Sequence, residues 1–90
     1  MASYVSCGFV TSVLNDFMPK DRWFTVQDAY AVVRRNSPVG KYDRVFGSWG
    51  NHPRWQHNIR CALYRLKKTG ALVHHKGRYI YAESQLSYPL

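Results

Sequence analysis

Apolar residues recur every three or four positions between residues 51 and 70, a spacing that predicts one long amphipathic helix. The apolar stripe consists of Trp55, Ile59, Ala62, Leu63 and Leu66. We expect Asn51 or His52 to cap the helix, Pro53 to occupy its first position, and Gly70 to end it in the left-handed conformation. The opposite face is polar and basic, with Arg54, His57, Cys61, Tyr64 and Lys68 along its centre, Asn58 and Arg65 on one flank, and Arg60 and Lys67 on the other.

A shorter helix is predicted over residues 3–18, where Ser3 or Ser6 could cap the start and Pro19 prevents continuation. Its apolar face consists of Val10, Val13, Leu14 and Phe17, with Phe9 beside them. We interpret this helix as part of the core scaffold.

A second short helix is predicted to begin after Thr25, because Thr25 and Asp28 have the spacing of a capping box. It should end near Arg35 and Asn36, since Ser37-Pro38 cannot continue a helix. Its apolar face consists of Val26, Ala29, Tyr30 and Val33. Residues 20–24, which precede it, are expected to form a turn and a short extended piece.

Two strands are predicted after the long helix, at residues 71–75 and 78–82, with Lys76-Gly77 as the turn between them. Three helices followed by a two-stranded wing describe a winged helix-turn-helix of the α+β class. We expect residues 1–82 to form this domain and residues 83–90 to form a C-terminal tail.

The connection at residues 36–52 is long for so small a domain, and long connections are often functional. It is rich in glycines and in large apolar side chains, namely Tyr42, Val45, Phe46 and Trp49. These side chains could fold back over the core, or they could form a surface that stacks on a base.

Positive charge is concentrated in the second half of the chain. The net charge is +8, and no acidic residue occurs from Arg44 to Ala82. Such one-sided charge is typical of a protein that binds a polyanion, although a basic surface can also serve solubility alone. A basic helix face beside a basic hairpin favours DNA, with the long helix in the major groove and the hairpin along the backbone.

Several other classes of protein are disfavoured by the composition. Neither a membrane span nor a signal peptide is evident, so we expect a cytoplasmic, nucleoid-associated protein. Cys7 and Cys61 do not form a CxxC pair, which disfavours zinc and a disulfide framework. The only glutamate is Glu83, the aspartates are scattered, and His74 and His75 should point to opposite faces of a strand. We therefore predict no enzymatic activity, no cofactor and no metal.

Three segments, FTVQDAYAVV, NHPRWQHNIRCALYRLKKTGALV and KGRYIY, resemble the winged-helix domain of DpnI-type restriction endonucleases. The matching residues are Ile59-Arg60, Leu63, Leu66, Lys67-Lys68, Gly70, Leu72, Gly77 and Tyr79. The N-terminal winged-helix domain of Mrr-type enzymes is a weaker match. The resemblance implies a protein that recognises N6-methyladenine in double-stranded GATC-type sites, and it makes a nuclease domain in the same or another chain a candidate partner.

Two sets of DNA contacts follow from these expectations. The residues placed to reach base edges, or to form an apolar wall against the methyl groups, are Phe46, Trp49, Asn51, His52, Arg54, His57, Asn58 and Cys61. The residues expected to contact phosphates are Arg60, Tyr64, Arg65, Lys67, Lys68, Lys76 and Arg78. Two alternatives remain open: a dimerising regulator that ignores methylation, and a protein-interaction module on the same scaffold.

Overall fold

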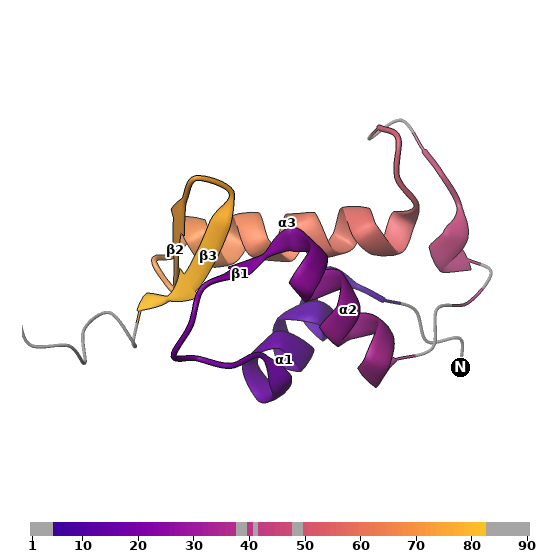
Figure 1. The fold of residues 1–90 in the computed structure, drawn as a ribbon. Helices are drawn as coiled ribbons and strands as arrows, with labels where there is room; N and C mark the ends of the chain where they lie inside the picture. The colour runs from indigo at the N-terminus through magenta and orange to yellow at the C-terminus, as the bar shows by residue number, and fades with distance from the viewer. Residues whose placement is uncertain (1–4, 38–39, 41, 48–49, 83–90) are drawn as a thin grey trace, which may run out of the picture.

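The computed structural model describes residues 5–37, 40, 42–47 and 50–82. It contains three α-helices, a short 3-10 helix and one three-stranded antiparallel sheet. The helices are α1 (Cys7–Phe17), α2 (Val26–Asn36) and α3 (Arg54–Lys68), and the 3-10 helix is η1 (Tyr42–Arg44). The strands are β1 (Phe24–Thr25), β2 (Leu72–His75) and β3 (Arg78–Tyr81). In Figure 1, α3 runs across α1 and α2, with the sheet beside its C-terminal end.

The sheet has one strand more than the sequence predicted. Its order is β1-β3-β2, so the predicted hairpin of β2 and β3 is extended by the piece before α2. Phe24 pairs with Tyr79, and their rings stack with centroids 5.8 Å apart. The predicted hairpin is confirmed, and the sheet is larger than expected because the short extended segment at β1 pairs with β3.

The first two helices each begin at a residue whose side chain caps the helix. Ser6 caps α1 by accepting a hydrogen bond from the Phe9 amide, so α1 is shorter at its start than predicted. Thr25 and Asp28 form the predicted capping box at the start of α2. Two residues assigned to the apolar side of α1 are exposed and not buried in the core, namely Phe9 at 40% and Phe17 at 57%.

The end of α3 follows the prediction closely. Gly70 has a φ of 87°, and its amide bonds to the Lys67 carbonyl while the Ala71 amide bonds to the Leu66 carbonyl. These two bonds form a Schellman motif, which satisfies carbonyls that the helix leaves without partners.

The start of α3 differs from the prediction. Pro53 is the cap residue, and no side chain caps the helix, so neither Asn51 nor His52 has that role. Instead, the Arg54 amide donates to the carbonyl of Val45, at 2.8 Å. The preceding segment therefore supplies the acceptor that a capping side chain would otherwise provide.

The core lies where the helices meet the sheet. Trp55, Ile59, Ala62 and Leu63 of α3 are buried as the stripe predicted, and Leu66 packs at the edge. Other buried members include Val10 and Leu14 of α1, Ala29, Tyr30 and Val33 of α2, and Leu72 and Tyr81 of the sheet. The polar face of α3 is thereby directed away from the core.

Candidate nucleic-acid interface

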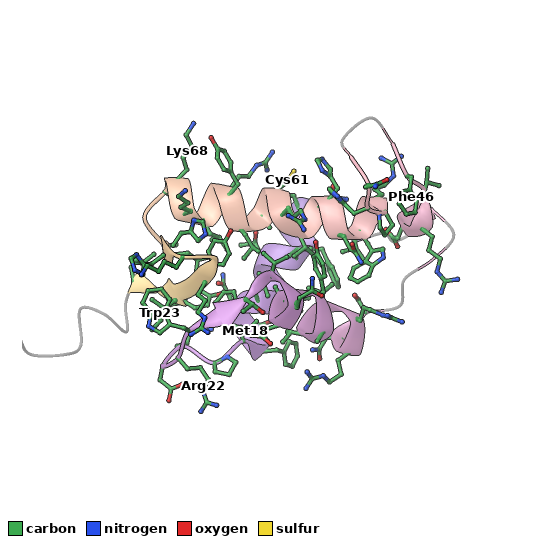
Figure 2. The ribbon with its side chains drawn as sticks, turned by 45° about the horizontal axis from the view of Figure 1, so that its top comes forward. Met18, Arg22, Trp23, Phe46, Cys61 and Lys68 are labelled. Atoms are coloured by element: carbon green, nitrogen blue, oxygen red, sulfur yellow. The ribbon has the colours of Figure 1, made fainter. Side chains whose placement is uncertain are left out.

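The C-terminal half of α3 presents an exposed basic surface. Tyr64 is 58% exposed, and the Nζ atom of Lys68 lies 5.6 Å from the centroid of its ring. Arg65 and Lys67 are exposed on either side. Figure 2 shows Lys68 and Cys61 on the side of α3 that faces away from α1 and α2. This surface can offer cations and a phenol hydroxyl to a polyanion without repacking the core.

The N-terminal half of the same face is more sheltered. Arg54, His57 and Cys61 are half-buried, and the ring of His52 stacks on that of His57 with centroids 5.8 Å apart. The Nε2 atom of His57 lies 3.4 Å from the Sγ atom of Cys61, as their spacing of four residues predicted. The segment before the helix thus covers part of the surface predicted to contact base edges.

The pKa of His52 is lowered from its ordinary value of 6.5, mainly by burial and further by the nearby charges of Arg60 and His57. A lowered pKa favours the neutral ring at pH 7. In that form the imidazole has one donor and one acceptor nitrogen, and its Nε2 atom is buried.

Phe46 is one of the two residues predicted to form the apolar wall. Its side chain is 59% exposed, and its backbone forms an isolated bridge with Pro53 immediately before α3. Asn51 is also exposed in this segment. Trp49, the other predicted part of the apolar wall, lies outside the described residues.

Asn58 is directed inward, and we withdraw it from the set of base contacts. Its Nδ2 atom donates a hydrogen bond to the Val5 carbonyl at 2.7 Å. This bond fixes the chain before α1 against α3. The helical spacing placed Asn58 correctly on a flank, but it could not show that Val5, which is distant in sequence, lies beside Asn58.

Arg60 lies on the flank that faces α2. Its Nε atom donates to the hydroxyl of Tyr30 at 2.7 Å, and its guanidinium carbon lies 5.9 Å from the centroid of that ring. The side chain is nevertheless exposed. The bond orients Arg60, and a guanidinium has further donors that could reach a phosphate.

The hairpin of β2 and β3 carries the remaining predicted phosphate contacts. Lys76 and Gly77 both have positive φ angles, 49° and 77°, as a two-residue type I′ turn requires. Lys76 and Arg78 are exposed at this turn. His74 stacks on Tyr79 with centroids 4.4 Å apart, which stiffens the hairpin on the opposite face.

Sequence reasoning missed two residues near the candidate interface. Asp43 is 1% exposed and bonds to the amide of Val5, so it holds the segment before α3 in place. Trp23 is 39% exposed next to β1, beside His75 of the hairpin. The signal for Trp23 was its position one residue from buried Phe24, since neighbours in a strand face opposite ways.

Two other features are absent from the described part of the chain. Within it, no three histidine, cysteine, aspartate or glutamate side chains gather as a metal site would need. Among the helices of these residues, none has the length and hydrophobicity required to cross a membrane.

Comparison of the chain with protein-family models, with curated proteins and with solved structures found no match.

Proposed function

We propose that this chain binds double-stranded DNA as a winged-helix domain. In this proposal α3 enters the major groove, and the hairpin of β2 and β3 contacts the phosphate backbone. The finer proposal is that the domain recognises N6-methyladenine in GATC-type sites, as the resemblance to DpnI-type nucleases implies. The bound DNA would then place the protein at the nucleoid, with no catalytic step of its own.

The main support is the exposed basic surface on the C-terminal half of α3. Its exposed members are Tyr64, Arg65, Lys67 and Lys68, and the sequence from Arg44 to Ala82 contains no acidic residue. Cations on a helix of 15 residues can reach several phosphates on both sides of a groove. The exposed Phe46 before the helix supports the finer proposal, because a methyl group in the major groove needs an apolar contact.

The phosphate contacts can be tested with two variants that each remove one positive charge, from opposite sides of the molecule. Figure 2 shows Lys68 on the outer side of α3 and Arg22 on the far side of the molecule. Lys68→Gln should weaken binding to every duplex. It should also reduce the slope of log affinity against log salt concentration by about one, the value expected for one lost phosphate contact. Arg22→Gln is the control, and it should change neither quantity.

Two other functions would give different results. For a regulator that does not distinguish methylated DNA, Lys68→Gln should still bind duplexes more weakly than Arg22→Gln. The original chain would bind methylated and unmethylated duplexes with equal affinity. A protein-interaction module would bind DNA weakly, with little dependence on salt, and Lys68→Gln would behave like Arg22→Gln.

A further inference from the structure

The outer face of the sheet combines apolar and basic side chains. Leu72, Tyr81 and Phe24 face the core, so their neighbours in each strand face outward. The outward set consists of Thr25, Val73, His75, Arg78 and Ile80, and Trp23 lies just before β1 beside His75. Ile80 is only 3% exposed although it is not part of the main core cluster.

A hollow of about 430 Å³ opens on this face. Among the described residues it is lined by Trp23, His75, Lys76 and Arg78, none of which is a carboxylate. The rings of Trp23 and His75 have centroids 6.5 Å apart and are tilted by 58°, so they are not stacked on each other. The indole is 39% exposed and can offer ring surface to a ligand.

We propose that this hollow binds one unpaired nucleotide of a single DNA strand. The base would stack on the indole of Trp23, and the flanking phosphates would contact Lys76 and Arg78. Aromatic side chains next to cations are the usual means by which proteins hold unpaired bases. The volume lies within the range of about 300–1,000 Å³ that small-molecule sites occupy, which suits a single nucleotide.

The hollow shares Lys76 and Arg78 with the hairpin surface proposed for the duplex, but Trp23 and His75 are not among the proposed duplex contacts. Figure 2 places Trp23 on the opposite side of the molecule from Lys68 and Cys61. A duplex bound to α3 would leave the indole accessible, whereas the phosphates of a duplex and of a single strand would compete for Lys76 and Arg78. The single-strand site goes beyond the proposed function and does not depend on it.

The test uses the whole chain, labelled with ¹⁵N, and a five-residue oligothymidylate followed by nuclear magnetic resonance. The indole signal of Trp23 is identified by its loss in Trp23→Phe. We expect this signal and the Gly77 amide to shift saturably on addition of the oligomer. The indole signal of Trp55 should stay in place, because Trp55 is buried in the core.

Affinity measurements on variants separate stacking from charge. Trp23→Leu should weaken oligomer binding by about tenfold, while Trp23→Phe should retain most of it. Phe17→Leu, which alters another exposed aromatic residue, should bind as the original chain does. Thermal melts of each variant establish that it is folded. An abasic oligomer of equal charge should bind about tenfold more weakly than oligothymidylate.

The proposal is overturned if Trp23→Leu binds the oligomer normally, or if the abasic oligomer binds equally well. Blunt duplex binding by Trp23→Leu should be unchanged. If the original chain binds the oligomer but does not bind duplex DNA, the proposed function is rejected and the single-strand site is retained.

Discussion

The carboxylate of Asp43 accepts a hydrogen bond from the backbone amide of Val5 at 2.9 Å, across 38 positions of sequence. Its second oxygen accepts from the Gly40 amide at 3.1 Å. The Val5 carbonyl in turn accepts from Asn58 of α3. The Val5 residue is therefore held from both sides, and it joins the segment before α3 to the helix itself.

Replacing Asp43 should destabilise the fold. Asp43→Ala removes both acceptors and leaves the Val5 amide buried without this partner, so we expect a loss of about 2 kcal/mol in the free energy of unfolding. The melting temperature should fall by roughly 10 °C, measured by circular dichroism. Asp16→Ala, at an exposed position, is the control and should change the melting temperature little. Equal melting temperatures for the two variants would show that the contact contributes nothing.

Asn58→Ala should act on stability and not on recognition. The variant loses the bond to the Val5 carbonyl, which should lower the free energy of unfolding by about 1–2 kcal/mol. Below its melting temperature it should bind each duplex with the same relative preference as the original chain. A changed base preference without loss of stability would return Asn58 to the set of base contacts.

Alkaline pH should weaken the attachment of the sheet to α1. Burial raises the pKa of Tyr81 from about 10 to about 12, and its hydroxyl donates to the Oδ1 atom of Asn15. The unfolded chain loses this proton near pH 10 and the folded chain only near pH 12. The stabilisation is thus fully present below pH 10 and is lost as the pH rises through 12.

The comparison with Tyr81→Phe isolates this effect. The difference in unfolding free energy between the original chain and the variant should shrink between pH 10 and pH 12, as measured by urea denaturation. Phe17→Leu, at an exposed residue that does not titrate, should show a difference that does not depend on pH. A constant difference for Tyr81→Phe would mean that its hydroxyl titrates normally.

Features that depend on neighbouring residues could be predicted from the sequence. The capping box of Thr25 and Asp28 and the end of α3 at Gly70 both follow from local backbone requirements, and both are confirmed. The buried stripe of α3 was likewise predictable, because helical periodicity alone determines which residues share a face.

Features that depend on distant partners could not be predicted in this way. Phe24 becomes part of the sheet only because Tyr79 lies beside it, and Asn58 turns inward only because the Val5 carbonyl is within reach. The start of α3 depends similarly on the Val45 carbonyl. Sequence spacing gave the face of each residue, but it could not reveal which faces the rest of the chain covers.

Phe46→Ala should reduce the preference for methylated DNA if its ring contacts the methyl group. The side chain is largely exposed, so its loss should have little effect on the melting temperature. We expect the ratio of affinities for methylated and unmethylated duplexes to fall severalfold, measured by fluorescence anisotropy. Trp49→Ala is expected to act in the same direction. An unchanged ratio in both variants would remove the proposed apolar wall.

The most direct test is a titration of the protein into fluorescent duplexes that carry one GATC site. Unmethylated, hemimethylated and fully methylated forms would be compared at two salt concentrations by anisotropy. We predict binding that weakens steeply with salt, and about tenfold tighter binding to the fully methylated duplex, equivalent to roughly 1.4 kcal/mol. Equal affinities for all three, still steep in salt, would contradict methyl recognition, and weak binding insensitive to salt would contradict DNA binding itself.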